Sequence, residues 1–416
     1  MNKVVILTLG CKQNKYESDC MANLLKNSGY EVSENLEFAD IYIINTCAVT
    51  SEAEKKSRQY ISKCLKLNDD AKIIICGCAS EKNSNQFDTK SNVFSIIGNE
   101  GKEKILDYIN NSIKEKNELS KVYISPQNPQ KTSTREHIKI QDGCNNFCSY
   151  CIIPYLRGRS RSRELQSIVD EAKILSTRSK EIVLTGIDIS SFQIDGKPAL
   201  PKLLDKLKDI PCTIRLGSLE VGVITEELMQ VLSNMPNFAP HFHLSLQSGD
   251  DEILKKMNRH YSSQEFFEKV CLIRKYFPLA NLTTDVIVGF AGETEEQFEN
   301  TKEFIKKVGF SFVHIFPYSK REGTRAYNME DLPMKVKKER VDILEKVNLE
   351  LRQKYLSQFE NKLGTMLVEE KKEFYEGFSP EYIRCYLDSD QVESGEKYKI
   401  KFLKPYKDGM KVELCK

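Results

Sequence analysis

The sequence predicts an α/β protein in three parts: a parallel α/β sandwich, an open partial barrel of six βα units, and a small C-terminal β-barrel. Apolar strand-like segments alternate with amphipathic helical segments over residues 1–115 and again over 130–355, a pattern typical of parallel sheets covered by helices. After residue 359, short strand-like segments follow one another with turn residues between them. A length of 416 residues fits two or three domains.

In the first domain, strands are expected at 3–9, 41–45, 73–76 and 93–97, and helices at 16–28, 52–67 and 102–113. This order predicts a parallel sheet with helices on its faces. Ligands of such sheets bind at the carboxyl ends of the strands. Cys11, Cys47 and Cys78 each follow one of the first three strands. The fold therefore places three thiols from distant parts of the sequence at one edge.

A polar stretch at 125–134 has the composition of a linker. Beyond it, six strands are expected at 137–141, 181–185, 213–216, 241–246, 282–288 and 312–316, with helical segments between them. Six βα units are fewer than the eight that close a barrel. We therefore expect an open barrel in the second domain, residues 130–355.

A long charged helix from residue 334 to about 359 leads into the tail, residues 356–416, where strands are expected at 365–370, 381–386 and 397–402. They predict a small β-barrel of a kind often used on RNA. Residues 357–416 hold 11 Lys and Arg against 12 Asp and Glu, so only a local basic face, including Lys399 and Lys401, would favour RNA. Phe378 and Tyr382 could stack on bases or pack in the small core.

Composition excludes several classes of protein. The formal charge is only +2, which excludes a histone-like polycation. No apolar run approaches the roughly 18 residues of a membrane span, and the start lacks a signal-peptide pattern. An odd number of cysteines, 13, without a secretion signal argues against a disulfide framework. We expect a cytoplasmic protein with no membrane partner, whose cysteines serve metal binding or catalysis or stay free.

The most informative segment is the loop of Cys144, Cys148 and Cys151, spaced C-x3-C-x2-C directly after the first strand of the second series. Three cysteines from one loop can converge on a single cubane iron–sulfur cluster. A zinc site would normally take four ligands, and no further Cys or His lies nearby. With three protein ligands, the fourth iron stays open to a substrate.

With Tyr150 just before its last cysteine, this loop resembles the signature of the radical S-adenosylmethionine (SAM) superfamily. The resemblance implies that the open iron chelates SAM and that one electron from the cluster cleaves it to a 5′-deoxyadenosyl radical. That radical abstracts hydrogen from the substrate, and the protein must exclude water and competing hydrogen donors. An electron donor of the flavodoxin or ferredoxin type is the partner that this chemistry implies.

The three thiols of the first sheet have a weaker signal. Taken singly, each fits an ordinary buried cysteine. Together, Cys11, Cys47 and Cys78 resemble the N-terminal domain of methylthiotransferases, in which three such cysteines bind a second [4Fe-4S] cluster. Cys76 is a neighbouring candidate, but the third ligand of that family follows the glycine. The remaining cysteines are expected to be free thiols.

Two clusters imply a division of labour. One makes the radical, and the other presents sulfur to the carbon that has lost hydrogen, because that carbon offers neither a leaving group nor acidity for two-electron chemistry. The resemblance adds methylation of the sulfur by a second SAM and a sulfur donor as partner. No catalytic residue beyond the cluster ligands is expected.

Further segments at predicted strand ends resemble the same family and are expected to line the SAM pocket. The expected cofactor-binding residues are Tyr150, Gly186, Ser218, Glu220, Gln247 and Gly289. Gly186 and Gly289 would allow close approach of the backbone, and Glu220 and Gln247 would hydrogen-bond the methionyl or ribose groups. The alternative for each is a turn or helix-cap residue. Ala291 stands where the family has proline, a departure that affects only the turn.

Four arginines in seven residues, Arg157, Arg159, Arg161 and Arg163, directly follow the cluster loop. A charge run is usually a solvated face, but arginine beside a reaction centre suits bidentate contacts to phosphate. We expect these four, with Lys399 and Lys401, to bind an RNA backbone. His241, His243 and His260 are expected to make local hydrogen bonds and to ligate no metal.

The resemblance spans essentially the whole chain and includes a tail similar to a TRAM domain, an RNA-binding β-barrel. The opening TLGCKQNKYES resembles the branch that adds a methylthio group at adenine C2 of N6-threonylcarbamoyladenosine, beside the tRNA anticodon. Alternative branches act on isopentenyladenosine in tRNA and on an aspartate of a ribosomal protein. A rival of another class is an iron–sulfur sensor that binds RNA without turning over SAM.

Overall fold

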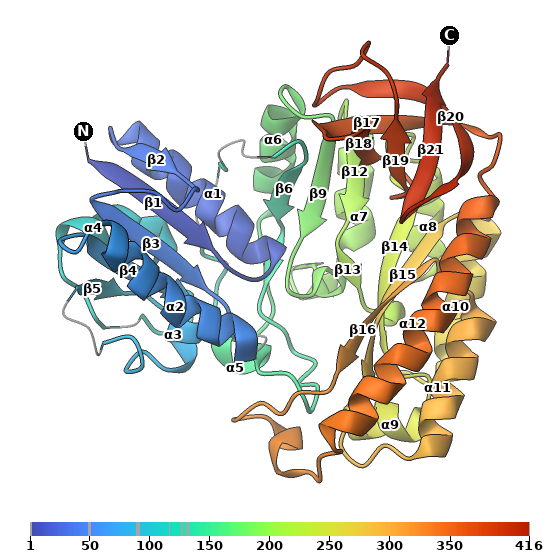
Figure 1. The fold of residues 1–416 in the computed structure, drawn as a ribbon, viewed down its shortest axis with the longest axis horizontal. Coiled ribbons are helices and arrows are strands. Elements are labelled where there is room, and N and C mark those ends of the chain that lie inside the picture. The colour runs from blue at the N-terminus through green and yellow to red at the C-terminus, as the bar shows by residue number, and fades with distance from the viewer. Residues whose placement is uncertain are drawn as a thin grey trace.

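The computed structural model describes residues 2–48, 51–88, 92–115, 117–125, 128–129 and 133–415. Figure 1 shows a sheet flanked by helices on the left, an open barrel on the right, and a small barrel above one end of it. The predicted α/β fold with these three parts is confirmed. Part of the predicted linker, residues 126–127 and 130–132, lies outside the described residues. The predicted domain bounds stay predictions.

The first sheet contains β1 (Lys3–Thr8), β2 (Glu31–Ser33), β3 (Ile41–Thr46), β4 (Lys72–Gly77) and β5 (Val93–Ile96). All pairs are parallel, in the order β2-β1-β3-β4-β5. The inner strands are nearly continuous apolar runs because helices cover both faces of the sheet. These are α1 (Lys12–Asn27), α2 (Ser51–Leu67), α3 (Cys78–Lys82), η1 (Lys102–Lys104) and α4 (Ile105–Asn110).

Helix α1 begins at Lys12, four residues before the predicted start. Its first turns carry Gln13, Asn14 and Glu17, which are polar and yet buried. Because these buried residues are polar, the first turns lack the periodic apolar positions that indicate a helix, and the sequence could not predict where α1 begins. They are buried because α1 contacts β6 of the second unit.

The second unit has six long parallel strands: β6 (Glu136–Lys139), β9 (Glu181–Thr185), β12 (Thr213–Leu216), β14 (His241–Gln247), β15 (Asn281–Val288) and β16 (Phe312–Pro317). They form the sheets β12-β9-β6 and β13-β14-β15-β16, with the short β13 (Ser218–Leu219) at the seam. No pairing joins β6 to β16 among the described strands, so the predicted open barrel is confirmed. Short additions are β7 (Gln141–Asp142), β8 (Arg161–Ser162), β10 (Gln193–Ile194) and β11 (Lys197–Pro198).

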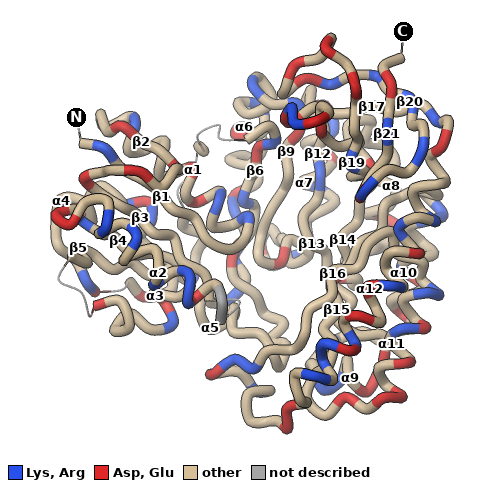
Figure 2. The backbone as a smooth tube through the Cα atoms, in the orientation of Figure 1, with Lys and Arg blue, Asp and Glu red and all other residues tan. Residues whose placement is uncertain are grey.

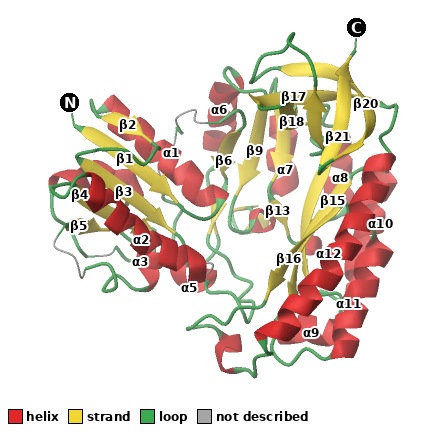
Figure 3. Ribbon diagram, viewed as in Figure 1, coloured by secondary structure: helices red, strands yellow, loops and turns green. Residues whose placement is uncertain are grey.

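Most helices of this unit lie on the outer side of its barrel, as Figure 3 shows. The helices are α5 (Ile153–Arg157), which lies beside α3 of the first unit, α6 (Leu165–Ser176), α7 (Leu200–Leu207), α8 (Glu226–Ser233), α9 (Asp251–Lys256), α10 (Ser263–Tyr276), α11 (Glu295–Val308) and α12 (Met334–Ser357), with the turns η2 (Ile189–Ser191), η3 (Val221–Val223) and η4 (Arg325–Asn328). In Figure 2, acidic and basic residues are interspersed along α10, α11 and α12. No helix in the described part of the chain has the length and apolarity to cross a bilayer.

Alternation along the strands separates the helix-facing core from the barrel interior. On β14, Phe242, Leu244 and Leu246 are buried in the core beneath the helices. Because successive side chains of a strand point to opposite faces, His243 and Gln247 face the inside of the barrel. The interior of this barrel is therefore polar where its outer layer is apolar.

The tail is a closed barrel of β17 (Leu363–Lys371), β18 (Tyr375–Phe378), β19 (Arg384–Leu387), β20 (Lys397–Tyr406) and β21 (Gly409–Leu414). It joins the second unit through Tyr382, whose ring stacks between His241 at 4.9 Å and Phe378 at 4.7 Å. The Arg215 guanidinium lies over the same ring at 4.7 Å. Phe378 and Tyr382 are thus packed against protein groups at this junction, which favours the packing alternative over base stacking.

Candidate functional site

The loop between β7 and α5 carries Cys144, Cys148 and Cys151 at the carboxyl end of β6. The Cys144 backbone N–H donates to the Gly158 carbonyl at 3.1 Å, and the Cys151 N–H donates to the Cys148 carbonyl at 3.0 Å. Phe147, between them, has a φ of +46°, a conformation uncommon for a bulky residue and typical of constrained functional loops. The loop thus fixes three free thiols on one short, tightly turned segment.

The environment of these thiols suits a metal cluster. Each thiol lies within electrostatic reach of the others, and burial raises the pKa of Cys144 and Cys151 to about 12, so a bound metal would be needed to hold them as thiolates. Two N–H groups point at sulfur: Arg259 Nη1 to Cys148 Sγ at 3.2 Å, and the Asn146 backbone to Cys144 Sγ at 3.4 Å. Such bonds to sulfur tune iron–sulfur clusters. The donor set therefore fits an iron–sulfur cluster with three protein ligands.

Arg259 is a site residue that sequence reasoning missed. Its guanidinium bonds Cys148 and also pairs with the Glu220 carboxylate. It follows α9 in a segment without a recognised motif, so only the folded chain could connect it to the loop.

The other three thiols lie at the carboxyl edge of the first sheet. Cys11 follows β1, Cys47 follows β3, and Cys78 follows β4. Gly10 has a φ of +94°, and a Cβ there would lie 2.6 Å from Cys47 Sγ, so glycine permits the close approach of the first two segments. Cys76 packs in the core on the opposite face of the sheet from Cys78. The ligand role of the three edge thiols stays a prediction.

A buried ion-pair network joins the two cysteine groups. Arg157 donates from Nη1 to Glu17 Oε1 at 2.9 Å and to Asp142 Oδ1 at 3.2 Å, and from Nη2 to Asn14 Oδ1 at 2.8 Å. Lys139 pairs with both Glu17 and Asp142 at 2.7 Å. Burial alone would raise the pKa of Asp142, but Lys139 and Arg157 hold it at about 2. The carboxylates therefore stay ionised between the two units.

Arg157 also places the two sets of thiols relative to each other. It lies within electrostatic reach of Cys11 and Cys78, and its helix α5 directly follows Cys151. Ile152 and Leu156 of the same segment belong to the core beneath the first sheet. The segment after the cluster loop is thus built into the unit that carries the other thiols.

The expectation that four arginines bind RNA is wrong for three of them. Arg157 is fully buried in the network above. Arg161 is buried and pairs with Glu100 at 3.2 Å, and Arg163 is buried and pairs with Glu171. Buried guanidinium groups with carboxylate partners cannot reach a phosphate. Only Arg159 is exposed, with its guanidinium over the Phe147 ring at 4.3 Å.

The tail lysines have different environments. Lys399 is exposed on β20, whereas Lys401 Nζ lies 3.8 Å from a Glu413 carboxylate oxygen. Lys397, on the same strand, donates to Thr213 across the junction. The RNA role of Lys399 and Lys401 stays a prediction.

Four of the expected cofactor residues lie on or next to strand ends, and Tyr150 lies in the cysteine loop itself. Gln247 ends β14 with a φ of +67° beside a register shift, a distortion typical of strands next to active sites. Ser218 is exposed at the seam, and Tyr150 packs edge-on against Phe290 at 6.4 Å. At Gly186 a Cβ would meet Ile189 Cγ2 at 2.6 Å. Cofactor contacts by these residues, and by Glu220, stay predictions.

Gly289, the sixth expected cofactor residue, lies close to helix α12. Its φ is +66°, and a Cβ there would lie 2.5 Å from Lys337 Cγ of α12. Its N–H donates to Glu293 Oε2 at 2.7 Å. The space beside this glycine is therefore filled by Lys337, and its role in cofactor binding stays a prediction.

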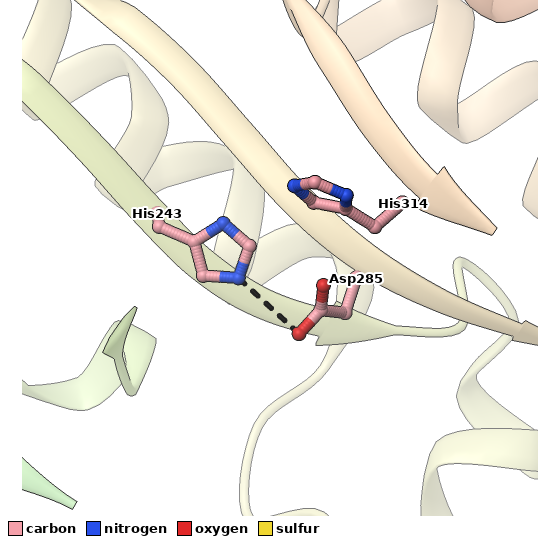
Figure 4. A group of neighbouring side chains, drawn as sticks. All are labelled: His243, Asp285 and His314. Atoms are coloured by element: carbon pink, nitrogen blue, oxygen red, sulfur yellow. Dashed lines mark ion pairs between the residues drawn. The ribbon is translucent and has the colours of Figure 1, made fainter. Parts of the chain in front are cut away.

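A polar cluster inside the barrel was also missed. His243, Asp285 and His314 come from the adjacent strands β14, β15 and β16, with ligand atoms within 4.8 Å of one another (Figure 4). His243 Nε2 lies 3.2 Å from Asp285 Oδ2, and its Nδ1 lies 2.9 Å from Thr283 Oγ1. The expected local hydrogen bonding of His243 is confirmed. The sequence could have indicated this cluster, because each of the three residues occupies an inward-facing position on one of three neighbouring strands.

Comparison with known proteins agrees with this architecture. The Radical SAM superfamily profile matches residues 138–305, and that of Uncharacterized protein family UPF0004 matches residues 3–99. The solved structure of the radical SAM methyltransferase TsrM from Kitasatospora setae has a TM-score of 0.60 at 14% identity, covering 78% of this chain and 77% of that one. An open parallel barrel with a C-x3-C-x2-C loop at its strand ends defines a radical SAM protein.

Sequence relatives narrow the class. The threonylcarbamoyladenosine tRNA methylthiotransferase MtaB of Bacillus subtilis is 37% identical over 438 aligned residues, covering 100% of this chain and 97% of that protein. The tRNA-2-methylthio-N(6)-dimethylallyladenosine synthase of Bacillus licheniformis is 35% identical over 387, covering 88% and 76%. The chain belongs to the MtaB family of radical SAM methylthiotransferases. SAM and [4Fe-4S] clusters are the cofactors of this family.

Proposed function

We propose that the protein adds a methylthio group at adenine C2 of N6-threonylcarbamoyladenosine, beside the anticodon of tRNA. One structural observation supports the proposal: the segment that follows Cys151 packs into the unit that carries Cys11, Cys47 and Cys78. Arg157, in the helix that follows Cys151, lies within electrostatic reach of Cys11 and Cys78. Radical formation and sulfur delivery need this neighbourhood, because a carbon radical must meet its sulfur before it reacts elsewhere.

Each group of thiols has its own task. Cys144, Cys148 and Cys151 would hold the cluster to which SAM binds, and Cys11, Cys47 and Cys78 would hold the second one. When bound, these groups supply hydrogen-atom abstraction at one side of the substrate and sulfur at the other. The chain itself holds both loops rigidly, since Glu17, Asp142 and their cationic partners are buried between them.

Arg259 and Glu220 support the first site. Arg259 directs an N–H at Cys148 Sγ while its charge is matched by the Glu220 carboxylate. A hydrogen bond to a ligand sulfur withdraws charge from it and raises the reduction potential of the cluster. We assign Arg259 as a positioning residue and Glu220, Gln247, Ser218, Gly186 and Tyr150 as the wall against which SAM lies.

The partners follow from the chemistry. A tRNA is the substrate, Arg159, Lys399 and Lys401 contribute to its backbone contacts, and the protein works in the cytoplasm where tRNA is modified. Reduction of the first cluster takes an electron donor of the flavodoxin or ferredoxin type. Repeated turnover takes a sulfur donor, because every product carries one sulfur away.

The second candidate is methylthiolation of isopentenyladenosine in tRNA, which the Bacillus licheniformis relative supports. It has the same reaction at the same carbon and differs only in the group on N6. The first candidate is favoured because, among relatives that match along essentially the whole chain, the one named for N6-threonylcarbamoyladenosine is 37% identical and the one named for dimethylallyladenosine is 32% identical. The ribosomal aspartate and the sensor without turnover have no observation in their favour.

Mass spectrometry of nucleosides from bulk tRNA tests the assignment. A strain without the gene should lose 2-methylthio-N6-threonylcarbamoyladenosine and accumulate the unmethylthiolated nucleoside, and the intact gene should restore the product. Accumulation of isopentenyladenosine would select the second candidate. Unchanged tRNA with an altered ribosomal protein would reject both.

A further inference from the structure

The inner face of strands β14, β15 and β16, called here the floor of the barrel, carries polar groups that the cluster chemistry does not use. His243, Asp285 and His314 face inward from β14, β15 and β16. Lys12, the residue after Cys11, lies within electrostatic reach of His314. Its ammonium group also acts on His137 and His241, at the start of β6 and β14. Lys12 therefore reaches from the first sheet into the barrel of the second unit.

The charge of Lys12 is unmatched in the described part of the chain. No ion pair or hydrogen bond of its ammonium group is found there, and the residue is exposed. The two nearby guanidinium groups have carboxylates of their own, since Arg135 pairs with Glu369 and Arg215 with Glu181. A cation without a partner beside the polar inner face of the barrel favours an anion as ligand.

Asp285 offers a complementary feature. One carboxylate oxygen is bound to His243, and the side chain remains 32% exposed. It can accept a hydrogen bond from a hydroxyl or amide N–H of a ligand. His314 is exposed and can donate or accept. The floor thus presents one cation, one acceptor and one neutral group that can do either.

We propose that this floor is the subsite for the N6 substituent of the substrate, an inference that rests on the proposed function. A threonylcarbamoyl group carries a carboxylate, a hydroxyl and ureido N–H groups. Lys12 pairs with the carboxylate, and Asp285, oriented by His243, accepts from the hydroxyl or N–H. An isopentenyl group has no polar atom, so it could neither pair with Lys12 nor donate a hydrogen bond to Asp285. The same residues therefore select one modified adenosine over the other.

A divalent cation is the other ligand that the triad could take, because two histidines and a carboxylate suit transition metals. Two observations favour the organic substituent. Both ring nitrogens of His243 already have partners, Thr283 and Asp285. The Lys12 charge within reach of His314 opposes a dication at the same place.

The test uses the reconstituted holoenzyme and anticodon stem-loop RNAs of one sequence. One RNA carries N6-threonylcarbamoyladenosine, and another carries its carboxamide, in which the carboxylate is a neutral amide. Lys12→Met is compared with Lys12→Arg and with Lys15→Met. Lys15 is a matched control on the same helix, whose ammonium pairs with Asp19 and Glu34 at 2.7 Å.

Lys12→Met should lower kcat/KM on the acid RNA by about 10- to 100-fold, the range of a charged hydrogen bond, and change it little on the amide RNA. Lys12→Arg should recover most of the loss, and Lys15→Met should match the wild type. Asp285→Asn should reduce kcat/KM on both RNAs. Equal loss by Lys12→Met on both RNAs, or no loss on either, would overturn the inference.

Two further outcomes separate this inference from others. If the wild type modifies only an isopentenyladenosine RNA, the proposed function fails before the subsite is tested. Titration of the holoenzyme with Mn²⁺, followed by electron paramagnetic resonance, should detect no bound ion that Asp285→Asn abolishes. A stoichiometric ion that this variant loses would make the triad a metal site and overturn the inference.

Discussion

Arg157 Nη1 donates a hydrogen bond of 2.9 Å to Glu17 Oε1, between residues 140 positions apart, and both side chains are buried. Glu17 lies on the helix that follows Cys11, and Arg157 lies on the helix that follows Cys151. This one contact therefore holds the two groups of cysteines in a fixed relation. Loss of this contact should therefore both destabilise the protein and disturb the relative positions of the cysteines.

Replacement of Glu17 by glutamine should destabilise the protein by about 3–5 kcal/mol, because Arg157, Lys139 and Lys102 then lose a buried counter-charge. Urea unfolding followed by circular dichroism measures the change. Asp205→Asn, which breaks the exposed pair with Lys208 at 2.9 Å, is the control and should leave stability nearly unchanged, because water screens an exposed pair. A Glu17→Gln protein as stable as the wild type would show that the network does not hold the units together.

The two groups of cysteines should be separable by iron content and by reaction. Anaerobically reconstituted wild type should hold about eight irons, and Cys144→Ala or Cys47→Ala about four, if each site holds a four-iron cluster. Cys144→Ala should form no 5′-deoxyadenosine, whereas Cys47→Ala should still form it and yield no methylthiolated RNA.

Cys271→Ser is the control for these variants, because Cys271 is an exposed free thiol on α10, outside both groups. It should keep full iron and full activity. Continued cleavage of SAM by Cys144→Ala would remove that residue from the first cluster. Four irons in the wild type would remove the second cluster from the account.

His137 should contribute to acid sensitivity. Burial, with Lys12 and Arg135 nearby, lowers its pKa to about 4 from an ordinary 6.5. Between these values the unfolded chain binds a proton that the folded His137 does not, so stability falls as the pH drops through this window, by up to about 3 kcal/mol. Above pH 6.5 the effect is absent, and below pH 4 it is complete.

His137→Gln should remove this term. The difference in unfolding free energy between wild type and variant, measured from pH 7.5 to pH 4, should drift in favour of the variant as the pH falls. A constant difference over this range would mean that His137 titrates normally in the folded protein.

Arg159 is the one member of the arginine run that is free to contact RNA. Arg159→Ala should weaken tRNA binding and reduce the slope of log affinity against log salt by about one, the effect of losing one phosphate contact. Lys208→Ala, on α7's exposed C-terminal side, should change neither quantity. An unchanged slope for Arg159→Ala would remove it from the interface, and the same titration of Lys399→Ala tests the small barrel.

Much of this fold could be predicted because its strands are long apolar runs between amphipathic helices. The positions after β1, β3 and β4 follow from the parallel order alone, so Cys11, Cys47 and Cys78 could be placed at one edge. The C-x3-C-x2-C loop could also be recognised, because its three cysteines lie close together in the sequence. Strand β18 escaped prediction because it has only four residues and includes a glycine, whereas β21 has an alternating Met-Lys-Val-Glu-Leu pattern that the sequence analysis did not use.

What could not be predicted depends on contacts that form only in the folded chain. Arg161 and Arg163 have the composition of a solvated basic run, yet their carboxylate partners come from Glu100 and Glu171, at other positions in the chain. The cluster of Asp285 and His314 exists only through the pairing of β15 with β16. Gly289 has the sequence signature of a cofactor turn, but α12 fills the space beside it. The role of a charged run or of a glycine can therefore be assigned only when the residues that contact it are known.

Isotope transfer tests the central claim most directly. The holoenzyme is given SAM, a reductant and a stem-loop RNA whose N6-threonylcarbamoyladenosine carries deuterium at adenine C2, and the nucleosides are analysed by mass spectrometry. The account predicts that deuterium appears in 5′-deoxyadenosine and that the same adenine carbon gains the methylthio group. Deuterium retained on the methylthiolated nucleoside, or lost to solvent instead, would contradict it.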